Sequence, residues 1–187
     1  MVKIEVAKPI NFNEVITSKE AEVVSMRILN QPNSYISLFS LAKDEEITAN
    51  HNYSIEARNN LKLIEIGEKI GDKNMGNKTL KMLESANTFN LAEIVDYQKG
   101  KIVSKNLVAK SNLVMTVMSF WKGESLDPHK ASGDALVTVL DGEGKYYVDG
   151  KPFVVKKGES AVLPANIPHA VESETENFKM LLILVKE

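Results

Sequence analysis

A predicted β-hairpin around Asp149-Gly150 constrains the fold of this chain more than any other feature. The runs 146–148 and 153–155 flank the turn, and both are rich in β-branched and aromatic residues. An Asp-Gly pair supplies the positive φ angles that a two-residue turn needs between right-twisted strands. Similar short runs, separated by Gly, Pro, Asn or Asp, predict eight strands, at 101–104, 113–121, 135–140, 145–148, 153–156, 160–163, 169–172 and 178–185. This spacing is typical of a jelly roll built from two sheets.

Two glycine- and histidine-containing segments flank the hairpin. In the first, five residues separate Gly123 from His129, and the segment ends at Gly142. In the second segment, five residues separate Gly158 from Pro164, and His169 follows. Over roughly residues 89–187, these segments resemble the two cupin motifs, G-x5-H-x-H-x3,4-E-x6-G and G-x5-P-x-G-x2-H-x3-N.

The resemblance implies a mainly β protein whose C-terminal half is a cupin double-stranded β-helix. It also implies that the motif histidines and glutamate converge on a metal inside the barrel. Here Ala131 stands at the position of the second His, and Ala135 stands at the position of the Glu. In the second motif Asn166 replaces a Gly, and Ser173 replaces the final Asn. The chain looks most like small bacterial cupins of unassigned function, which keep one His in the first motif, followed by an Asp-Ala pair.

His129 and His169 are therefore the candidate ligand-binding residues. They could hold one divalent metal (Zn, Fe, Ni or Mn), or they could be two polar anchors in a metal-free apolar pocket. Asp134 is the first candidate for a third metal ligand, and Glu124, Asp127 and a His from elsewhere are the other candidates. Because side chains alternate along a strand, Asp134 would need a β-bulge to reach the histidines. The alternative is that Asp134 orients the loop that follows His129.

Trp121 is a further candidate for ligand binding. It lies two residues before Gly123 at the end of a predicted strand. Amphipathic rings favour half-buried positions such as the mouth of a ligand pocket. Core filling is the alternative for Trp121, as it is for Phe120 and for the strand methionines Met115, Met118 and Met180.

A partial internal repeat appears when the sequence is shifted by 79 positions. Residues 10–47 then lie over residues 89–126, with eight identities in thirty-eight ungapped positions. Unrelated sequences of this composition would share about two or three. We infer that the N-terminal residues copy the opening strands of the barrel. Strands that such a half-barrel cannot close alone would pair with the C-terminal barrel or with another subunit, so we expect a homodimer.

The repeat is interrupted after His51. Leu61 and Ile64, together with Leu63, Ile66 and Ile70, have helical spacing, and 79–86 predicts a second short helix. A strand over residues 61–66 is the alternative. The predicted organisation is therefore a partial cupin-like repeat at 1–52, a helical connector at 53–87 and a cupin barrel at 88–187.

Composition excludes several classes of function. The formal net charge of −2 provides no basic surface for nucleic acid or for an anionic membrane. The chain has no Cys, which excludes disulfides, thiol nucleophiles and thiolate metal sites. The N-terminus has no apolar signal-peptide region, and no apolar run of 18 residues occurs. We therefore expect a cytoplasmic protein.

These observations favour a small-molecule-binding module with His129 and His169 in its pocket. One alternative is a metal-dependent enzyme of the isomerase, dioxygenase or decarboxylase type, which would gain support if Asp134 reaches the histidines. Another is an assembly protein that uses the duplicated half-barrel for dimerisation. Because one fold hosts many functions, the resemblance does not choose among them, and whether the protein is an enzyme stays open.

Overall fold

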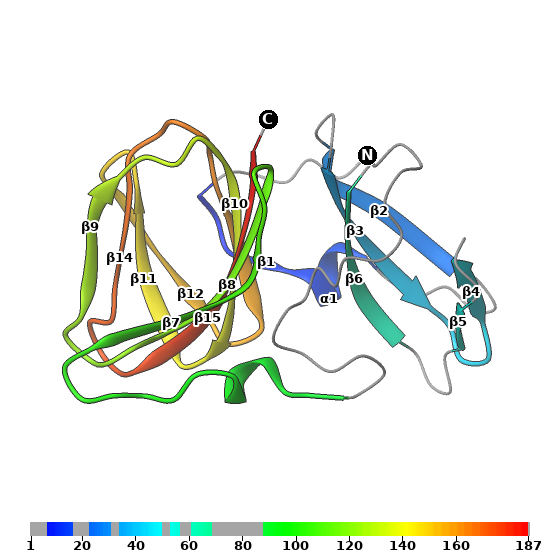
Figure 1. Cartoon of the computed structure of the whole chain (residues 1–187), viewed down its shortest axis with the longest axis horizontal. Coiled ribbons are helices and arrows are strands. Elements are labelled where there is room, and N and C mark those ends of the chain that lie inside the picture. Colours follow the sequence, from blue (N-terminus) through cyan, green and yellow to red (C-terminus); the bar gives the residue numbers. More distant parts are fainter. Residues whose placement is uncertain are drawn as a thin grey trace. The chain divides into compact units, whose positions relative to one another are not determined.

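The computed structural model describes residues 7–16, 23–30, 34–49, 53–56, 61–68 and 88–186. The chain forms two compact units, each of which is coherent in itself (Figure 1). The first contains the described residues up to 11 and from 88 onward, and the second contains those from 12 to 68. Within the described part of the chain, no helix is long and apolar enough to cross a membrane.

The first unit is a barrel made of two antiparallel sheets. The larger sheet has the strand order β1-β13-β10-β15-β8-β7, and the smaller has the order β12-β11-β14-β9. The strands of the larger sheet are β1 (Ile10–Asn11), β7 (Ile102–Ala109), β8 (Leu113–Phe120), β10 (Gly133–Asp141), β13 (Glu159–Leu163) and β15 (Phe178–Lys186). Those of the smaller sheet are β9 (Ser125–His129), β11 (Glu143–Val148), β12 (Lys151–Lys156) and β14 (His169–Glu172). A short 3-10 helix, η1 (Leu91–Glu93), precedes β7.

The predicted hairpin and the eight predicted strands are all present. Val148 pairs with Lys151 across the two-residue turn, where Asp149 has φ 52° and Gly150 has φ 73°. Strands β1 and β9 were not predicted as strands. Pro128 lies inside β9, which is tolerated because β9 is the edge strand of its sheet.

Aromatic side chains fill the interior of the barrel. The rings of Phe120 and Phe178 stack with centroids 4.6 Å apart, and Tyr146 meets Phe178 edge-on at 6.3 Å. The hydroxyl of Tyr146 donates to the sulfur of Met180 at 3.2 Å. All four residues belong to one buried apolar cluster. The predicted core role of Phe120 and Met180 is therefore confirmed.

The second unit contains two smaller antiparallel sheets. Its three-stranded sheet has the order β2-β3-β6, with β2 at Val23–Asn30, β3 at Ser34–Leu41 and β6 at Leu61–Glu68. Strands β4 (Glu46–Ala49) and β5 (Tyr53–Glu56) form a two-stranded sheet. A single helical turn, α1 (Phe12–Val15), precedes them.

The predicted repeat is visible in the strands themselves. Adding 79 to the bounds of β2 and β3 gives 102–109 and 113–120, which are the bounds of β7 and β8. The registers also agree, because Val23 pairs with Leu41 as Ile102 pairs with Phe120. Both pairs of strands even shift register at the same place, between Arg27 and Leu29 in one and between Asn106 and Val108 in the other.

The helix predicted around Leu61–Ile70 is wrong for the residues that the structure describes. Residues 61–68 form strand β6, which pairs with β3 from Leu61 opposite Leu41 to Glu68 opposite Ser34. Residues 53–56 are also a strand. The apolar residues around Leu61 fit a helical period as well as an alternating one, and pairing along all of β3 decides for the strand. The second predicted helix, at 79–86, lies outside the described residues.

Candidate functional site

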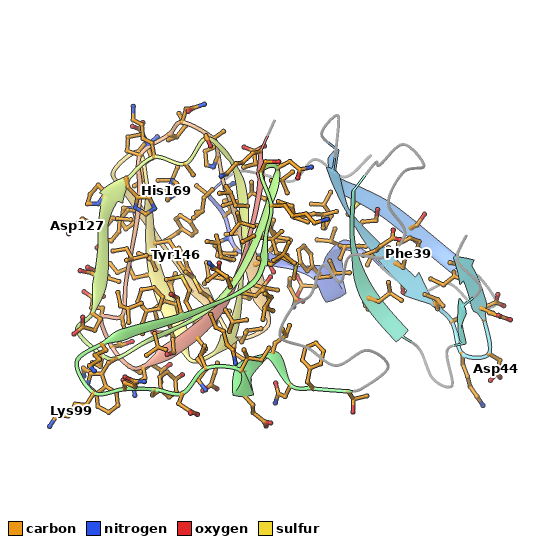
Figure 2. All side chains as sticks on the ribbon, viewed as in Figure 1. Phe39, Asp44, Lys99, Asp127, Tyr146 and His169 are labelled. Atoms are coloured by element: carbon orange, nitrogen blue, oxygen red, sulfur yellow. The ribbon has the colours of Figure 1, made fainter. Side chains whose placement is uncertain are left out.

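His129 and His169 lie directly opposite each other on neighbouring strands. His129 is the last residue of β9, His169 is the first residue of β14, and the two are cross-strand partners. Their ring centroids are 4.6 Å apart, and the ring planes meet at 64°. Figure 2 shows His169 and Tyr146 inside the barrel, whereas Asp127 lies on its outer side. The structure therefore brings together the two histidines predicted from the sequence.

A β-bulge in β9 places the two rings on the same side of the sheet. Val171 pairs with Leu126, and the next pair along the strands is His169 with His129. The step covers two residues on β14 and three residues on β9. Without the extra residue, alternation would turn His129 to the face opposite Leu126. The bulge instead directs His129 to the side that carries His169 and Val171.

Both imidazole rings are fixed by hydrogen bonds of the same kind. Nδ1 of His129 lies 2.8 Å from the carbonyl oxygen of Asp127, and Nδ1 of His169 lies 3.0 Å from that of Ile167. A carbonyl oxygen can only accept, so each Nδ1 carries the proton that it donates. In the neutral ring, Nε2 then keeps its lone pair. The site therefore presents two Nε2 acceptors.

The two rings differ in their exposure to solvent. His169 is buried, with 6% of its surface exposed, whereas His129 is exposed. Burial lowers the pKa of the His169 imidazole, and the neighbouring His129 ring lowers it further, against the opposing effect of the bond to Ile167. The neutral form of His169 is thus favoured. A buried ring beside an exposed one places the pair where the barrel interior meets solvent.

Two hydrogen bonds hold the loop before His169 against the segment that follows His129. The backbone N–H of Ala165 donates to Oδ1 of Asp134 at 2.8 Å, and that of Asn166 donates to the carbonyl oxygen of Ala131 at 2.8 Å. The loop after His129 is thereby tied to the loop before His169. Asn166 has φ 61°, a left-handed conformation that Gly or Asn adopts readily. This explains how Asn can replace the Gly of the second motif.

Asp134 orients a loop, but it is the loop before His169 and not the loop after His129 that the sequence analysis named as the alternative to metal binding. Its carboxylate accepts from the backbone of the loop that leads into His169. Over the described ranges, no group of three or more His, Cys, Asp or Glu side chains is placed to hold a metal ion. The donor set for a metal therefore consists of two imidazole nitrogens, which is fewer than a stable protein site normally uses.

Trp121 lies at the other end of β9 from His129. It follows β8 directly, and its backbone N–H donates to the carbonyl oxygen of Lys101 at 3.1 Å. The residue is half-buried, as the sequence analysis expected. The whole length of β9 separates it from the histidines, so the structure does not bring Trp121 to the pair.

A polar cluster and a hollow lie along the smaller sheet, and His169 is among the residues that line the hollow. The hollow has a volume of about 290 Å³, and Tyr147, Ala170 and Glu172 contribute to its lining. The hydroxyl of Tyr147 donates to Glu172 at 2.6 Å, and Lys145 forms an ion pair with Glu172 at 3.3 Å. The sequence analysis did not identify these residues. The sequence signal that could have identified them is the alternation of side chains along the strand. Because Tyr146 and Val148 are buried, the ring of Tyr147 between them points outward.

Comparisons with known proteins agree with the geometry. Residues 116–185 match the family model described as "Cupin domain". The chain is 70% identical to a Cupin 2 conserved barrel domain protein from Leptotrichia buccalis, with 100% of each chain covered and a TM-score of 0.87. No protein with a curated description matches.

Two further solved structures match only part of this chain. A conserved protein of unknown function from Streptococcus pyogenes is 34% identical over 60% of this chain and 98% of its own, with a TM-score of 0.58. A cupin superfamily protein from Desulfitobacterium hafniense is 26% identical over 58% of this chain and 98% of its own, with a TM-score of 0.55. These two relatives leave about two fifths of this chain without a counterpart, whereas the Leptotrichia protein matches all of it.

Proposed function

The chain belongs to the cupin superfamily, and we propose that it binds a small organic molecule at the barrel mouth through Nε2 of His129 and Nε2 of His169. The observation that carries this proposal is the matched hydrogen bonding of the two rings, in which each Nδ1 donates to a carbonyl oxygen. Two lone pairs on rings whose centroids are 4.6 Å apart suit a ligand that offers two donors, such as a diol.

The filled interior supports binding at the mouth. Val148, the cross-strand partner of His169, is buried together with Val171 in the apolar cluster that fills the barrel. A ligand that contacts the histidines would have its inner end against this apolar packing and its outer end near solvent. Pockets for small molecules commonly combine such an apolar wall with a few fixed polar groups.

A divalent metal held by His129 and His169 remains a second prediction. The tautomers of both rings suit metal binding, because a ligating imidazole normally donates its other N–H to a carbonyl or carboxylate. The donor set is incomplete, however, since Asp134 is bonded to the loop at Ala165. We therefore derive no catalytic step through a metal, and we favour the binding module over the enzyme.

Ligand-induced stabilisation that depends on the histidine pair tests the proposed function. We would measure thermal unfolding of the wild type in the presence of small diols, polyols and phenols, and separately with Zn, Fe, Ni and Mn salts. A ligand at one hundred times its Kd should stabilise the folded protein by about 2.7 kcal/mol. The double variant His129→Ala/His169→Ala should lose this stabilisation.

The exposed substitution Lys151→Ala in the β11–β12 hairpin is the control and should respond like the wild type. Stabilisation by metals but not by organic compounds would favour the metal site. Stabilisation that survives in the double variant would contradict binding at the histidine pair.

A further inference from the structure

The second unit corresponds to the barrel in more strands than β2 and β3. Strand β6 pairs with β3 as β15 pairs with β8: Leu61 lies opposite Leu41 where Phe178 lies opposite Phe120, and Glu68 lies opposite Ser34 where Val185 lies opposite Leu113. Adding 117 to every residue of β6 therefore gives its counterpart in β15. The three-stranded sheet β2-β3-β6 has the same order as β7-β8-β15 in the barrel.

The two-stranded sheet has its own counterpart in the barrel. Adding 79 to β4 gives 125–128, which lies within β9, and adding 116 to β5 gives 169–172, which is β14. The pairing agrees, because Ile47 lies opposite Ile55 as Leu126 lies opposite Val171. The offset changes from 79 to 116 between β4 and β5, so 37 residues present in the barrel have no counterpart there. The strands without a counterpart are β10, β11, β12 and β13.

Among the residues that the structure describes, this loss leaves one edge of each of the two sheets without the neighbour that it has in the barrel. In the barrel, β15 pairs with both β8 and β10, and β14 pairs with both β9 and β11. Among the described residues of the second unit, β6 pairs with β3 alone and β5 pairs with β4 alone. The open edges are thus the two at which the barrel adds its remaining strands. An open edge presents unpaired backbone N–H and C=O groups that another chain can pair with.

We propose that the second unit is an incomplete cupin barrel that is completed by the same unit of a second copy of this chain. In this arrangement β6 pairs with the partner's β6, and β5 pairs with the partner's β5. A two-fold axis perpendicular to the sheets makes both contacts antiparallel, as are the contacts β15–β10 and β14–β11 in the barrel.

The strand numbers support a second copy as the partner. Each second unit has a three-stranded and a two-stranded sheet, and doubling them gives sheets of six and four strands. Six and four are the numbers in the two sheets of the complete barrel. A two-stranded ribbon is marginally stable by itself, so the β4-β5 pair has most to gain from this addition.

The second unit does not retain the histidine pair. In the repeat, Asn50 stands at the position of His129, and Tyr53 stands at the position of His169. Joining two copies therefore does not create a second pair of imidazoles. We therefore assign the second unit to association with a second copy of the chain. This role does not depend on the ligand site proposed above.

Solution mass and matched edge variants test this proposal. Light scattering on the full chain should give about twice the chain mass of 20.7 kDa. Ile64 in β6 is 37% exposed, and Ile64→Lys would bring like charges together near the axis, so we expect the dimer to be lost. Val23 is also 37% exposed but lies on β2 at the other edge of the sheet, so Val23→Lys should remain dimeric.

Disulfide crosslinking provides a second test that does not depend on dissociation. Because the natural chain has no Cys, single substitutions give unambiguous crosslinks. Paired residues of antiparallel strands approach within about 5.5 Å between Cα atoms, a separation that a disulfide can span. A two-fold antiparallel contact brings a residue opposite its own copy only at the axis, so single cysteines are placed in turn at every position from 62 to 66. At least one of them should form a crosslinked dimer under mild oxidation, whereas Val23→Cys should not. A monomeric wild type, or a dimer that survives Ile64→Lys and that no β6 cysteine crosslinks, would overturn the proposal.

Discussion

Gly142→Ala should destabilise the barrel by on the order of 3 kcal/mol, through backbone strain and steric overlap together. Gly142 has φ 70°, a conformation that favours glycine. A Cβ atom added there would lie 2.3 Å from the backbone carbonyl oxygen of Asn177, which cannot move aside as a flexible side chain could. The contact explains why the first motif ends in Gly at this point. Urea denaturation followed by the fluorescence of Trp121, the single Trp of the chain, measures the effect in the barrel.

Gly100→Ala is the matched control for this substitution. Gly100 also has a positive φ, 64°, but nothing lies within 4 Å of the added Cβ. Only the conformational cost of about 1 kcal/mol should therefore appear. Equal destabilisation by the two substitutions would show that the close approach to Asn177 does not matter.

Phe178→Ala should cost about 3–5 kcal/mol, the usual range for deleting a buried aromatic ring. Phe178 is fully buried, and its ring contacts both Phe120 and Tyr146 in the barrel interior. The free energy of unfolding, again followed by Trp121 fluorescence, measures the cost.

Phe89→Ala is the control, because the Phe89 side chain is 51% exposed. Its effect should lie within about 0.5 kcal/mol of zero. Comparable losses at Phe178 and Phe89 would contradict the account of the aromatic core.

Much of the fold could be predicted because its signals are local. The Asp149-Gly150 turn fixes a hairpin by backbone conformation alone, and the shifted repeat correctly located the pair β2–β3. Strand β9 could not be predicted, because Pro128 and its polar neighbours have low strand propensity. The extended conformation of β9 is stabilised by its pairing with β14. For β6, pairing with β3 decided between two periodicities that the sequence could not separate.

The candidate site was predictable in its residues and less so in its geometry. The motif spacing led to His129 and His169, which the structure pairs across two strands. The bulge that turns His129 inward could not be predicted from the sequence, because it depends on the register in which β9 pairs with β14. The carbonyl oxygens of Asp127 and Ile167, which set the ring tautomers, belong to the backbone and carry no residue-specific signal.

The tautomers of His129 and His169 test the central claim most directly. Nitrogen NMR of 15N-labelled protein near neutral pH distinguishes a protonated ring nitrogen from one with a lone pair. The chain has three His, so the single variants His129→Gln and His169→Gln suffice to assign the two rings. The account predicts that both neutral rings carry the proton on Nδ1 and keep the lone pair on Nε2. A proton on Nε2 of either neutral ring would contradict it, because the site would then lack its second acceptor.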